Sequence, residues 1–293
     1  MQLYRYLCIS LLFIFMCTVI TRPRKTNHTN NTQSTSFTHT EDTQKKHTVI
    51  IDLTNVLFKE NQGEFAKKIG YGVLASYAIT HWKSPGYRCL DMLAAISKDD
   101  TQKPHITITL KGRTMPRCII ELQEGTKNCS QVRTEIAQCI EMLEQTKFFS
   151  SIKEKNLMLA IINLILDPNI TASVVEPMKQ TVHLVQKLKK AGHAVYLFAN
   201  APDEMYSSIE KTYPEILQLF DGIVISSRIK KVKPATSMFN HLTNTYNLDP
   251  HNCIIIDDLE ATIAAAKELG MDGIVYDKIS NVTSKLRRCG IKI

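Results

Sequence analysis

The sequence lacks the cysteine spacing of a zinc or thiol-redox protein. It has eight cysteines in 293 residues, and no two of them form a C-x-x-C pair. Zinc sites and thioredoxin-like sites are commonly built on such pairs, so both classes have little support here. Cys253 precedes an apolar run and is expected to be a buried small hydrophobic residue. A disulfide among the other cysteines would require export, and its pairing does not follow from the sequence.

The sequence also lacks the features of proteins that read specific nucleic-acid sequences. Its formal net charge is +8, but no basic stretch is interleaved with aromatic residues, and no zinc-finger spacing occurs. Part of the positive charge lies near the N-terminus, and part continues into the body as Lys187, Lys189, Lys190, Arg228, Lys230, Lys231 and Lys233. A small phosphate-bearing substrate or a solvated surface explains this charge better than a nucleic-acid partner.

A third absence is an apolar run of membrane-spanning length. An uncharged, mostly apolar run extends from Leu7 to Ile20 behind Arg5, shorter than the roughly 20 residues that a spanning helix needs. This length fits a signal-peptide core, although no A-x-A cleavage site follows it. Residues 1–22 are therefore predicted to be a signal peptide or a membrane anchor, with residues 7–20 as the tether. The protein is predicted to be exported (periplasmic or secreted) or anchored to a membrane.

Residues 23–47 lack the apolar side chains that could form a core. They are dominated by Asn, Thr, Ser, Gln and His, a composition typical of disordered segments. We interpret them as a disordered linker. The N-x-[ST] sites at Asn27 and Asn30 would matter only in a glycosylating secretory pathway.

A regular α/β pattern is present from Ala172 onward. Apolar strands are predicted at 194–198, 222–226, 253–258 and 273–276, with helices between them, the first starting near Pro177. Residues 48–51 have the same strand character. Strands that are apolar on both faces and alternate with amphipathic helices indicate a parallel sheet covered on both sides. The predicted fold class is α/β, a Rossmann-like parallel sheet with helices on both faces.

The stretch between the first strand and the others does not share this pattern. It contains helix-like runs at 71–79, 132–143 and 157–166, and an alternating segment at 106–110 that is compatible with a strand. We interpret residues 61–171 as an inserted, mainly α-helical cap domain. The core is then formed by residues 48–60 plus 172–293.

Polar side chains follow the predicted strands at the edge where the carboxyl ends of a parallel sheet converge. In chain order they are Asp52, Thr54, Asn55, Asn200, Lys233, Asp257 and Asp258. Carboxylates are hard oxygen ligands for Mg²⁺, and a lysine ammonium offsets phosphate charge. The pattern predicts a Mg²⁺ and phosphate site with Asp52 as an activated nucleophile. Taken singly, Asp52 also fits a turn or a helix cap, Lys233 a surface position and Asp258 a helix cap.

Three stretches carry a family resemblance: VIIDLTNVLF, FDGIVISSRIKKVKPATSMFNHL and CIIIDDLEATIAAAKELGM. Together with the strand end at Ala199 and Asn200, which supplies the second of four motifs, they resemble the haloacid dehalogenase-like (HAD) hydrolase superfamily, with the insertion between the first and second motifs. The paired aspartates look more like its phosphatase branch. The resemblance implies a Rossmann-like core, a mobile cap and a phosphoaspartyl intermediate. By position, Asp52 resembles the nucleophile, and Lys233 the lysine that steadies the nucleophile and the phosphoryl group. Asp257 resembles the Mg²⁺-ligating acid, with Asp258 beside it, and the main-chain carbonyl of Thr54 would be a further ligand.

The chain departs from the family pattern within the site. Thr54 stands where the family usually has the acid that protonates the leaving group, and threonine is a poor acid near neutral pH. Ala199 replaces the Ser or Thr whose hydroxyl binds phosphate. Asn55 replaces the usual Gly, and asparagine tolerates the positive φ that such a turn needs. Phosphate contacts are then expected from Thr54, Asn55, Asn200 and Lys233.

Two functions stay open at this point. The first is a Mg²⁺-dependent HAD-like phosphatase that acts on a small phosphorylated metabolite through an aspartyl phosphate. The second is a catalytically degenerate member that binds a phospho-ligand or a partner without turnover, which Thr54 and Ala199 favour. A membrane-tethered scaffold has only the N-terminal segment and the net charge behind it. The sequence defines neither the substrate nor the oligomeric state.

Overall fold

The structure, a computed structural model, describes residues 46–80, 85–96, 109–110 and 113–293. Its centre is a five-stranded parallel sheet with the strand order β7-β6-β1-β8-β9. The strands are β1 (Thr48–Ile51), β6 (Ala194–Ala199), β7 (Gly222–Ile225), β8 (Cys253–Asp257) and β9 (Asp272–Val275). The predicted α/β fold class is confirmed.

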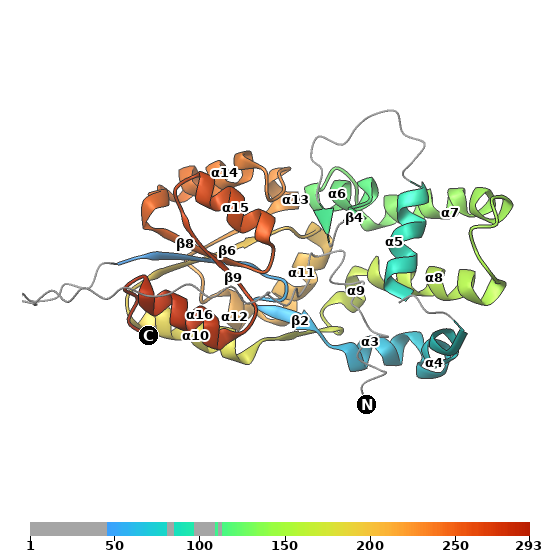
Figure 1. Ribbon diagram of the computed structural model, residues 1–293, viewed down its shortest axis with the longest axis horizontal. Coiled ribbons are helices and arrows are strands. Elements are labelled where there is room, and N and C mark those ends of the chain that lie inside the picture. Colours follow the sequence, from blue (N-terminus) through green and yellow to red (C-terminus); the bar gives the residue numbers. More distant parts are fainter. Residues whose placement is uncertain (1–45, 81–84, 97–108, 111–112) are drawn as a thin grey trace, which may run out of the picture.

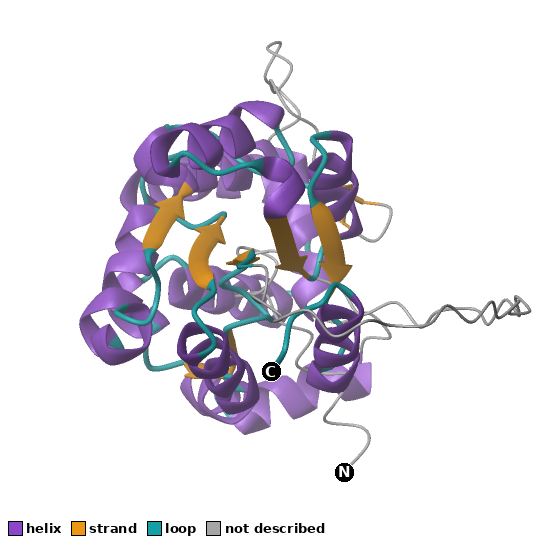
Figure 2. Cartoon of the chain, turned by 90° about the vertical axis from the view of Figure 1, so that its left-hand side faces the viewer, coloured by secondary structure: helices purple, strands orange, loops and turns teal. Residues whose placement is uncertain are grey.

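Different helices cover the two faces of this sheet (Figures 1 and 2). They are α14 (Thr236–Tyr246) and α15 (Glu260–Glu268) on one face, and α10 (Lys179–Lys190) and α16 (Ile279–Arg288) on the other. Side chains of β1 alternate between the faces: Ile50 packs in the cluster of α14 and α15, and Val49 and Ile51 pack in the other. Because both faces are covered, all four residues of β1 are buried.

The remaining core helices lie at the carboxyl edge or connect the strands. They are α11 (Asp203–Thr212), α12 (Pro214–Leu217) and α13 (Ser226–Ile229), together with the short 3₁₀ helix η2 (Pro250–Asn252). Helix α13 follows β7 directly and ends at Ile229; the next residue, Lys230, caps it with a left-handed φ of 56°. This turn directs the chain toward Lys233, at the edge where the candidate site lies.

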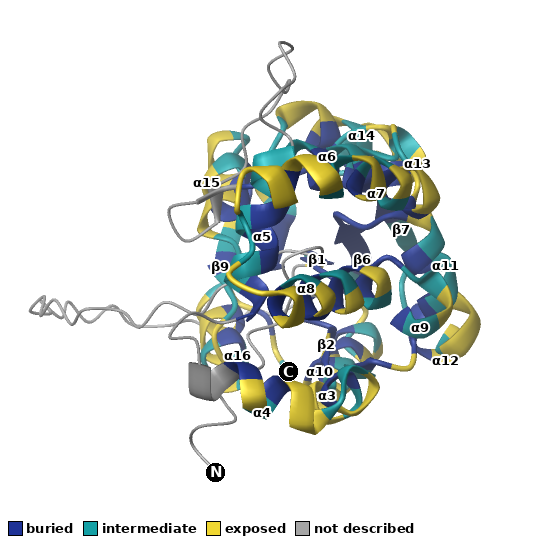
Figure 3. Ribbon diagram, turned by 90° about the vertical axis from the view of Figure 1, so that its right-hand side faces the viewer, coloured by how far each residue is buried: buried dark blue, intermediate teal, exposed yellow. Residues whose placement is uncertain are grey.

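The inserted domain is built mainly from helices, as its sequence predicts. They are α3 (Gln62–Ile69), α4 (Tyr71–Thr80), α5 (Pro85–Ile96), α6 (Arg117–Glu124), α7 (Cys129–Gln145), α8 (Ile152–Ile165) and α9 (Pro168–Thr171). A small hairpin, β3 (Thr109–Leu110) with β4 (Arg113–Thr114), accompanies them; residues 106–108 of the segment compatible with a strand lie outside the described residues. Figure 3 shows exposed residues on α3 and in the first turn of α4.

A two-stranded antiparallel ribbon joins the inserted domain to the core. It pairs β2 (Phe58–Glu60) with β5 (Val175–Pro177). The helix predicted to start near Pro177 is present and begins at Lys179, with Met178 as its N-cap; Pro177 itself ends β5 and is not part of the helix. Proline is tolerated in such a ribbon because an edge strand leaves N–H positions unpaired.

Three sequence-based predictions concern the ends of the chain and its cysteines. The leader, residues 1–22, and most of the linker lie outside the described residues. Residues 46 and 47 do bond to the core: Lys46 O accepts from Asn252 Nδ2 at 2.8 Å, and His47 N donates to His193 Nδ1 at 3.1 Å. None of the helices in the described ranges combines the length and the apolar character that a membrane span requires. Each cysteine of those ranges is a free thiol.

Candidate active site

Asp52 is the first residue after β1, at the carboxyl edge of the sheet. Its backbone N–H donates to Ile256 O at 3.0 Å, which ties it to β8, and its side chain is almost fully buried. The chain then turns tightly: Phe58 N donates to Leu53 O at 2.8 Å, and Asn55 has a φ of 58°. This turn brings Thr54 N within 3.1 Å of Asp52 Oδ2. The positive φ expected at Asn55 is present.

Lys233 lies at the centre of the site, and its ammonium group makes three contacts. Nζ donates to Asp52 Oδ1 at 2.6 Å, to Asp257 Oδ2 at 2.7 Å and to Phe198 O at 2.9 Å. An ammonium group has three donors, so all three are used. The side chain is 3% exposed, which leaves little competition from water. Residues that are far apart in the sequence thus meet at the predicted point.

Asn200 is held against the backbone of Lys233. Its Nδ2 donates to Lys233 O at 3.0 Å, and its Oδ1 accepts from Lys233 N at 2.8 Å. Both polar atoms of the amide are therefore engaged with one residue, although a phosphate contact was expected from Asn200. The structure shows this side chain fixing the position of Lys233.

Asp52, Asp257 and Asp258 form a buried acidic cluster. One carboxylate oxygen from each lies within 4.8 Å of the others, close enough to hold one metal ion together. Asp257 Oδ1 accepts from Leu259 N at 2.8 Å, and Asp258 Oδ2 accepts from Asn55 Nδ2 at 2.9 Å. Asn55, for which phosphate binding was expected, therefore also orients an acid of the cluster.

The electrostatics of the cluster follow from burial and from crowding of like charges. Burial raises the pKa of Asp52 to about 7, against the opposite effect of Lys233. Burial and the charges of Asp257 and Asp52 hold the pKa of Asp258 well above its usual range. Burial alone would lower the pKa of Lys233, but the two neighbouring carboxylates outweigh it and raise that pKa. The site concentrates more negative charge than its one lysine balances.

The residues of the cluster fit a divalent cation. Two buried oxygens, Asp258 Oδ1 and Thr54 Oγ1, have no hydrogen-bond partner among the described residues. Buried polar atoms are normally paired, so unpaired oxygens beside three carboxylates indicate room for a ligand of positive charge. Oxygen ligands of this kind suit Mg²⁺. The backbone of Thr54 lies next to the cluster, and its carbonyl remains a predicted ligand.

Sequence reasoning passed over Ser226, which the structure links to the site. Its hydroxyl accepts from Ala201 N at 3.0 Å, next to Asn200. The signal was available, because Ser226 directly follows β7 at the same carboxyl edge as the predicted residues.

Thr262 is fully buried in α15, and its hydroxyl lacks a partner among the described residues. Nothing in the structure explains why a threonine occupies this position.

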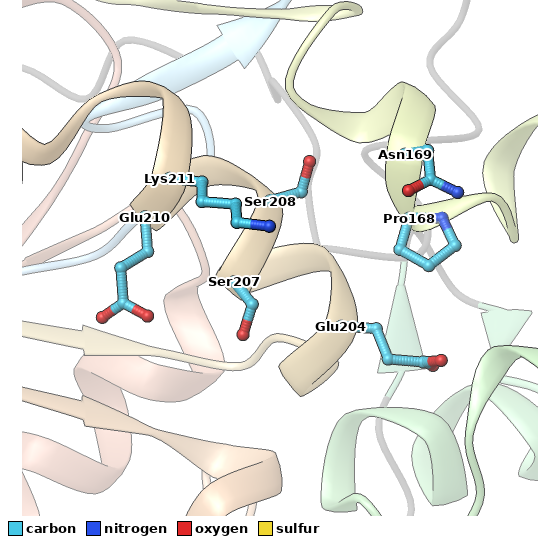
Figure 4. Close-up of a pocket in the computed structure, with 7 residues that line it drawn as sticks. All are labelled: Pro168, Asn169, Glu204, Ser207, Ser208, Glu210 and Lys211. Carbon is cyan, nitrogen blue, oxygen red and sulfur yellow. The ribbon is translucent and has the colours of Figure 1, made fainter.

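A separate hollow lies between the inserted domain and the core (Figure 4). It has a volume of about 430 Å³ and is lined by Pro168, Asn169, Glu204, Ser207, Ser208, Glu210 and Lys211, from α9 and α11. None of these residues belongs to the acidic cluster. The hollow is an open feature of the junction between the domains, and most of the residues that line it are of polar or charged type.

The sheet and the site together define a class: Rossmann-like α/β proteins with buried carboxylates and a lysine at the carboxyl edge. The sequence profile of the haloacid dehalogenase-like hydrolases matches residues 46–270. The chain therefore belongs to the haloacid dehalogenase-like hydrolase family.

Two curated relatives are similar to part of this chain. The sesquiterpene phosphatase astK of Aspergillus oryzae is 27% identical over 119 residues, and the mouse bifunctional epoxide hydrolase 2 is 26% identical over 103. These matches cover 41% and 34% of this chain, but only 57% and 18% of the relatives' lengths.

Among solved structures, a HAD family enzyme of Bacteroides thetaiotaomicron in complex with magnesium matches at a TM-score of 0.48 and 18% identity, over 83% of this chain and 98% of that one. A predicted HAD-like hydrolase of Porphyromonas gingivalis matches at 0.47 and 18%, with the same coverage.

Proposed function

We propose that this chain is a Mg²⁺-dependent phosphatase that acts on a small phosphorylated metabolite through an aspartyl phosphate on Asp52. The observation that carries the proposal is the buried cluster of three carboxylates, two of which bond to Lys233, with Asp258 Oδ1 and Thr54 Oγ1 lacking a partner among the described residues. The relative named as a sesquiterpene phosphatase supports the reaction class over the matched 119 residues.

The residues divide the work of phosphoryl transfer among them. Lys233 holds one oxygen of Asp52 and would balance charge on the incoming phosphoryl group. Thr54 N holds the other oxygen, so the carboxylate is fixed before a substrate arrives. A Mg²⁺ ion bound by Asp52, Asp257, Asp258 and the Thr54 carbonyl would offset the charge of the phosphate oxygens.

Thr54 narrows the range of favourable substrates. Because a threonine hydroxyl is a poor proton donor near neutral pH, the departing oxygen receives little help from residue 54. A leaving group of low pKa departs without such help. We therefore expect aryl and acyl phosphates and phosphoanhydrides to be hydrolysed much faster than simple alkyl phosphates.

The test is a panel of aryl phosphates with graded leaving-group pKa, assayed with and without Mg²⁺. Activity should need Mg²⁺, fall steeply as the leaving-group pKa rises, and drop on the order of 10⁴-fold in Asp52→Asn. Asp272→Asn, at the exposed start of β9, is the matched control and should behave as wild type. Absence of Mg²⁺-dependent turnover over the whole panel, or full activity in Asp52→Asn, would refute the proposal.

A binding protein without turnover is the second candidate, and Thr54 with Ala199 favours it. Ala199 is fully buried at the end of β6 and offers no hydroxyl to a phosphate. Losing one such donor costs roughly 10²-fold in rate by analogy with oxyanion-hole deletions. Activity that arises only in the combined variant Thr54→Asp, Ala199→Ser would establish this second candidate, whereas an aspartyl phosphate trapped on wild-type Asp52 would exclude it.

A further inference from the structure

The cap contacts the core at more places than the β2–β5 ribbon: α9 lies against α11, and α6 lies against α13. Helix α6 packs against α13, on the side of the junction opposite to β2 (Figure 1). Gly125 follows α6 with a φ of 68°, and an added Cβ there would lie 2.6 Å from the carbonyl oxygen of Ser227. The end of α6 therefore lies against α13 too closely for any residue with a side chain.

Core side chains bind the carbonyl groups at this helix end. Ser226 Oγ donates to Gln123 O at 2.6 Å, and Lys230 Nζ donates to Gly125 O. The last carbonyls of a helix have no partner inside the helix, so side chains of the core supply hydrogen-bond donors to the end of α6. Ser226 has no exposed surface, which shields its contact from water.

The same hydroxyl also holds the loop that follows β6. Ser226 Oγ accepts from Ala201 N at 3.0 Å. The preceding residue, Asn200, binds both backbone polar groups of Lys233. A connected series of contacts therefore runs from Gln123 in the cap, through Ser226 and the loop at 199–201, to Lys233.

One proton of Ser226 has two acceptors within reach. Gln123 O lies at 2.6 Å and Ala201 O at 3.5 Å from Oγ. A hydroxyl donates a single proton, so the docked cap takes it at the shorter distance. When α6 moves away from α13, the acceptor that remains for the Ser226 proton is Ala201 O, a carbonyl of the loop itself. Docking of the cap therefore changes the hydrogen bonding of the loop beside Lys233.

We propose that Ser226 is a positioning residue that couples docking of α6 to the geometry of the loop at 199–201 and, through Asn200, to Lys233. Its effect on turnover rests on the proposed phosphatase function. The coupling itself is a property of the cap and the core, so it can be measured without turnover.

The test disturbs the coupling from both ends. Ser226→Ala removes the hydroxyl, and Gly125→Ala forces α6 away from α13 without touching Ser226 or the loop. Ser227→Ala is the matched control for the first, because Ser227 is buried and its hydroxyl has no partner among the described residues. Gly290→Ala is the control for the second, because Gly290 has a φ of 86° but no atom within 4 Å of the added Cβ.

Two readouts are compared among these variants. Amide hydrogen exchange of Ala201 and of residues 117–125 should become at least tenfold faster in Ser226→Ala and in Gly125→Ala. With an aryl phosphate, kcat should fall about tenfold in both, the loss of one aligned contact, while KM changes less than threefold. The double variant should be no slower than Ser226→Ala alone, because both changes break the same connection.

The outcomes separate this inference from the proposed function. Gly125→Ala with rapid exchange in α6 but wild-type exchange at Ala201 would overturn the coupling, as would additive losses in the double variant. Inactivity of the wild type would end the phosphatase proposal, and exchange at Ala201 would still decide the coupling. Losses in either control equal to those in the test variants would reduce Ser226 to a general packing role.

Discussion

The core and the cap each contain a buried network of charged groups, and the two differ in how completely their atoms are paired. In the cap, Glu154 is 2% exposed, and each of its carboxylate oxygens has a partner. Arg88 Nε donates to Oε1 at 2.8 Å, and Ser150 donates to Oε2 from its backbone N–H at 2.6 Å and from its hydroxyl at 2.7 Å. Arg88 also bonds to Phe148 O and stacks over that ring.

In the core network, the described residues do not supply a hydrogen-bond partner for every polar atom. Asp52 and Asp257 share the single ammonium group of Lys233, and Asp258 Oδ1 has no partner among the described residues. The pKa values differ accordingly. Burial raises the pKa of Asp52 to about 7. Burial would raise the pKa of Glu154 as well, but the bonds from Ser150 and Arg88 lower it overall.

This difference distinguishes a structural network from a functional one. A buried charge whose hydrogen-bonding capacity is filled by the protein stabilises one arrangement of helices and offers nothing to a ligand. A buried charge left partly unpaired costs stability until a ligand completes it. Removal of a residue should therefore act mainly on folding in the cap network and mainly on binding and turnover in the core network.

The largest effect on stability is expected from Glu154→Ala. It removes the carboxylate that accepts from Arg88 Nε and from Ser150, and breaking such a buried pair costs about 3 kcal/mol or more in the free energy of unfolding. Urea unfolding measures this loss. Glu144→Ala is the matched control, because Glu144 pairs with Lys155 on the surface of the same domain, at 45% exposure; its loss should stay below about 1 kcal/mol.

Turnover of the folded fraction decides whether the comparison holds. Glu154→Ala should keep the kcat of the wild type in the absence of urea, because Glu154 is not part of the acidic cluster. A large loss of kcat with an unchanged free energy of unfolding would assign the cap network a functional role and break the distinction.

The sequence predicted the contacts of the core that depend on strand order. Because parallel strands end at one edge, Asp52, Lys233 and Asp257 could be placed together, and Lys233 Nζ lies at 2.6 and 2.7 Å from their oxygens. Strand order does not determine the direction in which a side-chain amide points. Strand order therefore did not indicate that both polar atoms of Asn200 bind the backbone of Lys233, and a contact of Asn200 with phosphate stays a prediction.

Contacts of the cap were harder to predict, because they join residues with no shared pattern. Arg88 and Glu154 are 66 positions apart, and Ser226 and Gln123 are 103 apart. Helix α6 did have a local signal: Pro116 precedes it and Gly125 follows it, as is typical of helix ends. Its docking on α13 follows only from the folded chain.

The next largest effect on stability is expected from Glu60, a buried acid that belongs to neither network. It lies in β2 of the connecting ribbon, and neither carboxylate oxygen has a hydrogen-bond partner among the described residues. Burial raises the pKa of Glu60 from 4.5 to about 8. Between these values the folded state binds more protons than the unfolded state, so stability falls as pH rises. From pH 5 to 8 the loss is about 3 kcal/mol.

Glu60→Gln should abolish that loss, because an amide does not titrate. We expect the difference in melting temperature between wild type and variant to shift in favour of Glu60→Gln as the pH rises from 5 to 8. Glu268→Gln, an exposed substitution on α15, should track the wild type throughout. If the melting temperatures of wild type and Glu60→Gln changed with pH in parallel, Glu60 would have a hydrogen-bond partner in solution. The β2–β5 ribbon would then resemble the cap network, in which the carboxylate is fully paired.

The smallest effect is stabilisation by Mg²⁺, and it compares the two networks directly. A ligand that binds only the folded state stabilises it by about 2.7 kcal/mol at a hundredfold excess over its Kd, which for a chain of this size raises the melting temperature by about 5–10 °C. Wild type and Glu154→Ala should gain equally, because the acidic cluster is intact in both. Asp257→Asn should gain much less, because it removes one of the three carboxylates that can share the ion. An equal gain in Asp257→Asn would place the ion elsewhere, and the unpaired oxygens of Asp258 and Thr54 would then need another ligand to account for them.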